Sequence, residues 1–312
     1  MRAFIFPGQG SQAVGMGKVL ADASPTARAV FEEVDHALGQ NLFKLMCDGP
    51  DSDLMLTENA QAAIMANAIA TLRVLEKEGG VRLSEKCDFV AGHSLGEYTA
   101  LCAAGALPLA VTASLLKLRG RAMQAAVPIG IGAMAALLGA DIEKAEALAT
   151  AAAESETCAV ANDNDPSQVV ISGHKGAIDR AIERAKEHGI KRGILLPVSA
   201  PFHCPLMQPA ADEMASALAA TTIHAPLVPL YANVTAEPTA DPDTIARQLV
   251  GQVTGRVRWR ESAVAMHAAG VTHFVEFGGK VLSPMVKRSA GEEVTTTSVI
   301  SMDDIEALLK EI

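Results

Sequence analysis

Short apolar runs alternate with long, alanine-rich stretches of helical periodicity along most of this chain. The apolar runs have the length of buried strands, whereas the helical stretches are much longer. Strands that alternate with helices favour a mostly parallel sheet with helices on both faces, so the sequence predicts an α/β fold. The predicted strands are 2–6, 87–93, 228–234, 272–278 and 294–300, and the longest predicted helices are 59–78, 108–126 and 207–220.

The stretch 130–198 follows a different order. It predicts strand, helix, strand, strand, helix, strand, which is the ferredoxin-like pattern. Asp141 suits the N-cap of its first helix, and Gly189 suits the end of its second helix. Between them, CAVAN (158–162) predicts a strand and DNDPS (163–167) predicts a turn. We therefore predict a small subdomain over 128–198, inserted into a large domain made of 1–127 and 199–312.

Composition and charge exclude several classes of protein. Apolar residues make up 49% of the chain and charged residues 20%, which is typical of a globular protein. A net charge of −10 argues against nucleic acid as a partner. No apolar stretch reaches the roughly 20 residues that cross a membrane. The five cysteines include no CxxC pair, so we expect neither a metal site nor disulfides, and a cytoplasmic location.

The motif Gly92-His93-Ser94-Leu95-Gly96 carries the strongest chemical signal. It matches G-x-S-x-G, follows the predicted strand 87–93 and precedes a predicted helix. This is the context of a nucleophile elbow, in which small flanking residues permit a tight turn that exposes the serine. The helix N-terminus after the turn favours developing negative charge. The alternative is a glycine-bounded turn with an exposed serine, because short matches of this kind occur by chance.

A serine nucleophile needs a base, and the chain has eight histidines. His203 stands out because it follows the predicted strand that ends at Val198, and active sites of open α/β sheets gather at strand ends. His93 is adjacent to Ser94, and we expect its side chain to point away from the nucleophile as a supporting hydrogen-bonding residue. No Asp or Glu stands out as a third member, so a backbone carbonyl could orient His203 instead.

The glycine-rich turn 7–12 follows the first predicted strand. Its exposed backbone N–H groups could form half of an oxyanion hole, with the N–H of Leu95 as the other half. The alternative is a phosphate-binding loop, which is less favoured because no G-K-[ST] follows.

Taken together, these motifs resemble a known family. GQGSQ (8–12), GHSLGE (92–97), RGRAMQ (119–124), LPVSAPFH (196–203) and VEFGGKVL (275–282) occur in the order found in malonyl-CoA:acyl carrier protein transacylases of bacterial fatty acid synthesis. The family includes the acyltransferase domains of polyketide synthases. The resemblance implies an α/β-hydrolase-like large domain with a ferredoxin-like insert. It also implies ping-pong transfer of malonyl from coenzyme A to the phosphopantetheine thiol of acyl carrier protein, without a cofactor.

The resemblance also implies a role for each residue of the reaction centre. Ser94 matches the nucleophile, which carries the malonyl group as an ester, and His203 matches the general base. Gln9 and Leu95 match the oxyanion-hole donors. Gln252 matches the position whose backbone carbonyl orients the histidine.

Further matched residues concern the acyl group and the cleft. Arg119 matches the arginine that binds the free carboxylate of malonate, which suits the bidentate geometry of a guanidinium. Asn162 and Asn164 match asparagines that line the cleft, and Met123 is expected among the substrate-binding residues. Phe202 precedes the base, where a bulky residue accompanies malonyl substrates and a small one methylmalonyl substrates.

The partner that the resemblance implies is an acidic carrier protein, so a basic docking surface is expected on this acidic chain. Each basic cluster in the sequence could be that surface or simply a solvated face. The clusters are Lys191 with Arg192, Lys280 with Lys287 and Arg288, and Arg256 with Arg258 and Arg260. We expect the protein to be a monomer.

Two other functions share some of these features. A serine hydrolase such as a thioesterase would have the elbow, but it would not need Arg119 and would be expected to have an acidic third member. A non-catalytic carrier-binding domain would not need Ser94 and His203 together.

Overall fold

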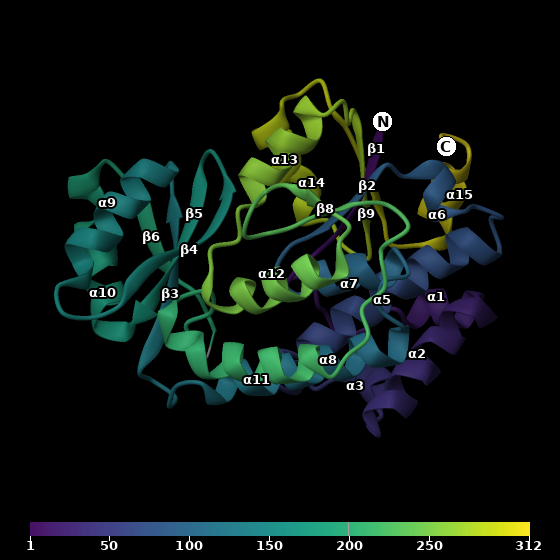
Figure 1. Cartoon of the computed structure of the whole chain (residues 1–312), viewed down its shortest axis with the longest axis horizontal. Coiled ribbons are helices and arrows are strands. Elements are labelled where there is room, and N and C mark those ends of the chain that lie inside the picture. Colours follow the sequence, from purple (N-terminus) through teal and green to yellow (C-terminus); the bar gives the residue numbers. More distant parts are fainter. Residues whose placement is uncertain (199) are drawn as a thin grey trace.

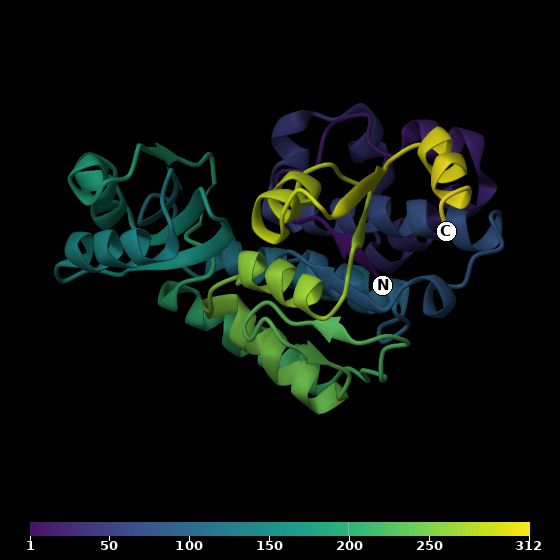
Figure 2. The ribbon, with the colours of Figure 1, turned by 90° about the horizontal axis from the view of Figure 1, so that it is seen from above.

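The structure is a computed structural model that describes residues 1–198 and 200–312. Figure 1 shows a large body of sheet and helices with a smaller unit, coloured teal, at one end of the long axis. The view from above in Figure 2 shows the same division. The predicted mixed α/β fold with a mostly parallel sheet is confirmed, and a separate antiparallel sheet lies in the smaller unit.

The large sheet has the strand order β10-β9-β1-β2-β7-β8. Neighbouring strands are parallel except for β7 and β8, which are antiparallel. All the strands predicted for the large domain are present, although the predicted strand 228–234 contains only a short β7. The bounds are β1 (Arg2–Phe6), β2 (Phe89–Gly92), β7 (Leu230–Tyr231), β8 (Pro238–Thr239), β9 (His273–Phe277) and β10 (Thr295–Val299).

Helices cover both faces of this sheet, which explains why the central strands β1 and β2 are almost entirely apolar. Phe4 and Phe6 of β1 belong to the buried cluster that includes α5 and α8, whereas Ala3 and Ile5 pack with α13 and α14 on the opposite face. The helices of the large body are α1 (Lys18–Ala23), α2 (Pro25–Leu38), α3 (Leu42–Asp48), α4 (Asp51–Leu54), α5 (Thr57–Lys77), α6 (Leu83–Lys86), α7 (Gly96–Ala103), α8 (Leu109–Ala125), η2 (Pro205–Met207), α11 (Gln208–Ala219), α12 (Pro242–Thr254), α13 (Trp259–Ala268), α14 (Leu282–Ala290) and α15 (Met302–Leu309).

The smaller unit follows the predicted order of elements. Its strands pair antiparallel in the order β4-β5-β3-β6, with helices packed against one face of the sheet. Asp141 caps the first helix by accepting a hydrogen bond from the backbone N–H of Lys144, and Gly189 ends the second helical segment with a left-handed conformation. The elements are β3 (Gly132–Leu138), α9 (Ile142–Ala153), β4 (Cys158–Asp165), β5 (Gln168–His174), α10 (Lys175–Arg184), η1 (Ala185–His188) and β6 (Arg192–Leu195).

The predicted turn DNDPS is shorter in the structure, because β4 continues to Asp165 and only Pro166 and Ser167 form the turn into β5. Asp163 and Asp165 are fully buried, which the sequence did not indicate. Arg260 of α13 pairs with Asp163 at 2.8 Å, and Arg288 of α14 pairs with Asp165 at 2.8 Å. These ion pairs with the large body stabilise an extended strand that local turn propensity alone would disfavour.

The edge of β4 also joins the large body through its backbone. The N–H of Asp163 donates to the carbonyl of Val257 at 2.9 Å, and the N–H of Val257 donates to the carbonyl of Ala161 at 2.8 Å. Together with the ion pairs of Asp163 and Asp165, these bonds fix β4 against the segment that precedes α13. We call this set of contacts the β4 clamp.

Some features concern the chain as a whole. Within the described ranges, no helix is both long enough and apolar enough to cross a membrane. The same residues contain no cluster of His, Cys, Asp and Glu side chains suited to a metal ion. All five cysteines are free thiols.

Candidate active site

Ser94 lies in the tight turn between β2 and α7. Its φ angle is 54°, in the left-handed region that a residue other than glycine seldom adopts. A Cβ atom at Gly92 would lie 1.9 Å from the backbone carbon of Gly96, and one at Gly96 would lie 2.2 Å from the carbonyl oxygen of Phe6. The flanking glycines are therefore required by backbone packing, which supports the elbow over a chance match.

The glycine requirement gives a direct test. We expect Gly92→Ala to destabilise the fold by about 3 kcal/mol or more. This is the upper end of the cost of overpacking, because the added Cβ clashes with backbone atoms that cannot easily move. The matched control is Gly251→Ala on α12, where a Cβ meets nothing within 4 Å. That variant should gain about 0.4–1 kcal/mol, because alanine reduces the entropy of the unfolded chain. Urea unfolding measures both; equal stability of the two variants would contradict the steric argument.

Asn233 braces the elbow from the loop after β7. Its Oδ1 accepts from the backbone N–H of Ser94 at 2.8 Å, and its Nδ2 donates to the carbonyl of Gly92 at 2.7 Å. The side chain thus spans the strained turn and holds its two ends. Sequence reasoning missed Asn233; the signal that could have found it is its place after the strand next to β2, where polar side chains of α/β sites gather.

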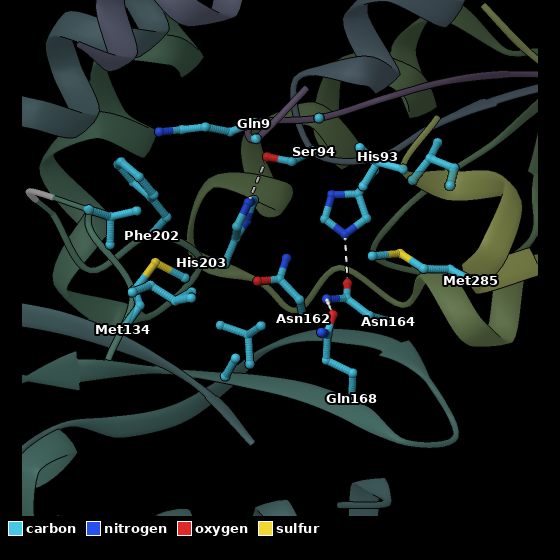
Figure 3. A pocket seen from close by; sticks show the side chains of 18 of the residues that line it. Gln9, His93, Ser94, Met134, Asn162, Asn164, Gln168, Phe202, His203 and Met285 are labelled. Carbon is cyan, nitrogen blue, oxygen red and sulfur yellow. Dashed lines mark hydrogen bonds between the residues drawn. The ribbon is translucent and has the colours of Figure 1, made fainter. Parts of the chain in front are cut away.

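His203 lies opposite Ser94, in the loop that precedes η2 (Figure 3). The Ser94 hydroxyl and Nε2 of His203 are 2.7 Å apart, and Nδ1 of His203 is 2.8 Å from the backbone carbonyl oxygen of Gln252. A carbonyl only accepts, so Nδ1 carries the proton and Nε2 is left to accept from the hydroxyl. The carbonyl occupies the place that an acidic residue holds in common serine triads.

The environment keeps His203 neutral. Burial and, after it, the positive charge of Arg119 lower the pKa of His203 to about 3. An uncharged imidazole at neutral pH is the form that can take a proton from a serine hydroxyl.

Arg119 reaches the same hydroxyl from α8. It is 1% exposed, and its guanidinium donates to Oε1 of Gln61 at 2.7 Å, to Oε1 of Gln252 at 2.8 Å and to Oγ of Ser94 at 3.2 Å. The guanidinium also lies 5.7 Å from the ring centre of Tyr98. Its position beside Ser94 comes from these amide contacts, since Gln61 and Gln252 hold it from opposite elements.

The charge of Arg119 is buried without an ion-pair partner. In the part of the chain that the structure describes, only neutral groups accept its hydrogen bonds, and its Nε has no partner. A buried charge of this kind is costly unless an anion compensates it. The site is therefore suited to a ligand that brings a carboxylate close to Ser94.

Two backbone N–H groups near Ser94, those of Gln9 and Leu95, are the expected oxyanion-hole donors. Phe6 of β1 and Gly92 of β2 are register partners, so the turn with Gln9 and the elbow with Leu95 leave the same edge of the sheet. Over residues 1–198 and 200–312, neither the Gln9 N–H nor the Leu95 N–H donates to a protein acceptor. Within these residues both N–H groups are thus left without a protein acceptor, and their role as oxyanion-hole donors stays a prediction.

A cavity of about 320 Å³ opens above Ser94, between the large body and the small sheet. Ser94, His203, Gln9 and Phe202 line one side, and the small sheet contributes Asn162 and Asn164 to the other (Figure 3). Apolar side chains of both parts complete the wall; they include Met134, Val170, Leu196 and Met285.

The sequence model of the acyl transferase domain family matches residues 3–300. The chain belongs to this family. A nucleophile elbow and a histidine held by a backbone carbonyl therefore line the cleft of an acyl transferase domain, and a buried arginine lies behind its wall. The resemblance noted from the motifs is confirmed.

Named relatives of this acyl transferase are closely similar over most of its length. It is 44% identical over 287 residues, or 92% of each chain, to the malonyl CoA-acyl carrier protein transacylase of Escherichia coli K12. The crystal structure of acyl-carrier-protein-S-malonyltransferase from Bartonella henselae is 50% identical, with a TM-score of 0.97 and coverage of 99% of this chain and 98% of that one. A malonyl-transacylase solved with a type II polyketide acyl-carrier protein is 36% identical, with a TM-score of 0.95 and coverage of 100% and 99%.

The position of His93 differs from the expectation. Its ring does not turn away from the site but lies on the cavity wall (Figure 3). It does make the expected hydrogen bond, from Nε2 to Oδ1 of Asn164 at 2.8 Å. Burial lowers the pKa of His93, so the ring is neutral at pH 7. His93 thus connects the elbow of this acyl transferase to the small sheet across the cleft.

Met123, which the sequence places among the substrate-binding residues, lies outside the cavity wall, as Arg119 does. Its side chain is 1% exposed, with its Sδ 3.9 Å from Nε2 of Gln61. Met123 follows Arg119 by one helical turn on α8, so it packs behind the guanidinium. Arg119, Gln252 and Leu95 are also buried behind the wall, beside Ser94.

The basic clusters differ in how far their side chains form ion pairs within the chain. Arg260 and Arg288 pair with the buried carboxylates of the β4 clamp. Arg256 pairs with Glu146 at 2.7 Å, and Arg258 pairs with Glu261. Most of the cluster 256–260 is thus engaged within the chain. Lys191 and Arg192, by contrast, are exposed.

Glu97 is a further buried group that sequence reasoning missed. It is 1% exposed on α7, and its Oε2 accepts from Nε2 of Gln252 at 2.7 Å and from the backbone N–H of Asn233 at 3.2 Å. Burial raises the pKa of Glu97 to about 7. The signal that could have found it is an acidic residue inside an otherwise apolar helical stretch directly after the elbow.

Proposed function

We propose that this acyl transferase moves a malonyl group from malonyl-CoA to the phosphopantetheine thiol of an acyl carrier protein. The observation that carries the proposal is the buried guanidinium of Arg119, which has no ion-pair partner among the described residues and lies 3.2 Å from Oγ of Ser94. A malonyl thioester bound at Ser94 brings a free carboxylate to that guanidinium. The proposal agrees with the functions for which the relatives are named.

The first half of the reaction forms an ester on Ser94. Nε2 of His203 takes the hydroxyl proton as Oγ attacks the thioester carbonyl carbon. The backbone N–H groups of Gln9 and Leu95 donate to the oxyanion of the tetrahedral intermediate, each worth about 2.7–4 kcal/mol in comparable sites. The C–S bond then breaks, and the coenzyme A sulfur leaves with the proton from His203.

The second half runs through the same groups in reverse. The carrier thiol enters the cleft, His203 takes its proton, and the sulfur attacks the ester carbonyl. The bond to Oγ breaks, and His203 returns the proton to Ser94. Ping-pong kinetics follow from the covalent intermediate, and no step uses a cofactor.

A serine hydrolase is the alternative function. It shares the elbow and the Ser94–His203 contact. It has no need for a buried cation beside the nucleophile, and it commonly orients its histidine with a carboxylate, whereas a carbonyl holds His203 here. Arg119 and Gln252 thus favour the transferase.

Malonyl-CoA alone, without a carrier, separates the two functions. We expect a burst of about one equivalent of free coenzyme A and a malonyl adduct on Ser94 in the mass spectrum. Phosphopantetheinylated carrier protein should then remove the adduct and gain the malonyl group. Continuous release of free malonate before carrier is added would contradict the proposal.

The arrangement of domains is part of the proposal. The large body corresponds to an α/β-hydrolase-like domain, and the small sheet with α9 and α10 to a ferredoxin-like subdomain over 128–198. The antiparallel order β4-β5-β3-β6 and the helices on one face support this description. The predicted restart of the large domain at residue 199 lies outside the described residues.

We place the carrier-docking surface at Lys191 and Arg192. Both are exposed, and neither takes part in an ion pair within the described ranges. They lie at the start of β6, which leads into the loop that carries His203. An acidic carrier bound there would stand beside the strand that borders the cleft.

A further inference from the structure

The side chain of Gln252 forms hydrogen bonds with several groups of the reaction centre. It is fully buried on α12, and its Oε1 accepts from Arg119 at 2.8 Å. Its Nε2 donates to Oε2 of Glu97 at 2.7 Å and to the backbone carbonyl of Ser94 at 3.0 Å. Its own backbone carbonyl accepts from His203 at 2.8 Å. One residue therefore contacts the groups assigned to nucleophile, base and carboxylate binding.

An amide side chain can be placed in two orientations, and Glu97 selects one of them. If the Gln252 amide were reversed, its oxygen would face the Glu97 carboxylate and its NH₂ group would face the donors of Arg119. The contact with Arg119 would be repulsive at any pH, because a guanidinium only donates, and the contact with Glu97 would be repulsive whenever its carboxyl group is ionised. The acceptor at Glu97 therefore keeps Oε1 of Gln252 directed at Arg119.

Glu97 also supports the elbow from a second direction. The oxygen that accepts from Gln252 accepts in addition from the N–H of Asn233, whose side chain spans the turn at Ser94. Its other oxygen, Oε1, is buried without a hydrogen-bond partner in the part of the chain that is described. Leaving a buried carboxyl oxygen unpaired costs stability, so packing alone does not account for this residue.

The indirect link between Glu97 and Arg119 matters for binding. A carboxylate in direct contact with the guanidinium would occupy the N–H groups that an acyl carboxylate needs. The Gln252 amide stands between the two charges, so Arg119 is held in place while its cation stays without an ion pair. Glu97 therefore fixes the orientation of Arg119 through Gln252, and the charge of Arg119 remains available to the carboxylate of the acyl group.

We propose that Glu97 is a positioning residue for acyl transfer, which acts by fixing the Gln252 amide so that Arg119 is aligned with Ser94. The inference rests on the proposed malonyl transfer. It assigns no contact between Glu97 and the substrate, so the loss of Glu97 is felt through Arg119. Malonyl transfer should therefore suffer more than acetyl transfer.

The test compares Glu97→Met, which removes the acceptor at similar length, with Glu97→Gln, which keeps an acceptor oxygen. The single-turnover rate of coenzyme A release is measured on the full chain with malonyl-CoA and with acetyl-CoA. We expect E97M to lose about 10- to 100-fold with malonyl-CoA and less with acetyl-CoA, as is typical when a supporting hydrogen-bond partner is removed. E97Q should keep most of the wild-type rate and the wild-type malonyl-to-acetyl ratio.

A stability control separates positioning from general damage. The control variant is Leu101→Ala. Leu101 lies on the same helix as Glu97 and is fully buried in the apolar core. L101A should lower the unfolding temperature and leave the malonyl-to-acetyl ratio unchanged. If E97M does not fold, Glu97→Asp replaces it, because the shorter side chain withdraws the acceptor from Gln252 while keeping the charge; its rate with malonyl-CoA should also fall.

The outcomes are distinct. A wild-type ratio in E97M, or in E97D where E97M does not fold, overturns the positioning role, and so does a loss in E97Q equal to that in E97M. The wild-type protein is assayed first with malonyl-CoA and phosphopantetheinylated carrier. Failure of the wild type to transfer malonyl would remove the proposed function itself, whereas normal transfer with unaffected Glu97 variants removes only this inference.

Discussion

Ser94→Ala is expected to lower kcat for malonyl transfer by about 10⁴- to 10⁶-fold, the range seen when a serine nucleophile is removed from a comparable centre. The variant has no oxygen to form the ester, so the burst of coenzyme A and the adduct should both disappear. Adding His203→Ala to it should cost little more, because groups that act as one unit are not additive. Stopped-flow detection of free thiol and intact-protein mass spectrometry measure these quantities.

Thermal unfolding supplies the control for this variant. Among the described residues, the Ser94 hydroxyl forms hydrogen bonds only with His203 and Arg119, so S94A should unfold close to the wild-type temperature. A malonyl adduct that persists on another residue of S94A would show that Ser94 is not the nucleophile.

Arg119→Ala is expected to reduce the preference for malonyl-CoA over acetyl-CoA by about 10- to 150-fold, which corresponds to the 1.5–3 kcal/mol of a charge-assisted hydrogen bond. Only the malonyl group has a carboxylate for the guanidinium, so kcat/KM for acetyl-CoA should change much less. The ratio of kcat/KM values for the two thioesters is the measurement.

Arg121→Ala is the matched control for Arg119→Ala. Arg121 lies on the same helix but points outward, where it pairs with Glu58 at 2.8 Å and is 64% exposed. R121A changes the same amount of charge and should leave the malonyl-to-acetyl ratio at the wild-type value. An unchanged ratio in R119A as well would remove Arg119 from carboxylate binding.

The parts of this protein that sequence predicts well are those with a local cause. Gly92 and Gly96 are dictated by contacts within one turn, so the motif alone indicates the elbow. The central strands β1 and β2 are almost entirely apolar because helices cover both faces of the sheet, and the alternation of strands with helices is visible without any tertiary information. His203 could be selected because it follows a strand.

The parts that sequence missed depend on groups brought together from distant segments. Asn233 braces a turn 139 positions away, and its place after the strand next to β2 becomes a signal only once the strand order is known. Asp163 has the local features of a turn residue, but Arg260 keeps it in a strand. Met123 lies in a motif of the family, yet the motif does not reveal on which side of Arg119 it packs. Tertiary contacts overrode local propensity in each case.

The β4 clamp limits how this protein can be recombined with its relatives. Asp163 and Asp165 lie within 128–198, while their partners Arg260 and Arg288 are encoded far downstream. A chimaera that exchanges 128–198 alone, into a host without matching arginines, would bury both carboxylates uncompensated. A transplant of the small sheet must therefore carry part of α13 and α14 with it, so the smallest exchangeable module is discontinuous in the gene.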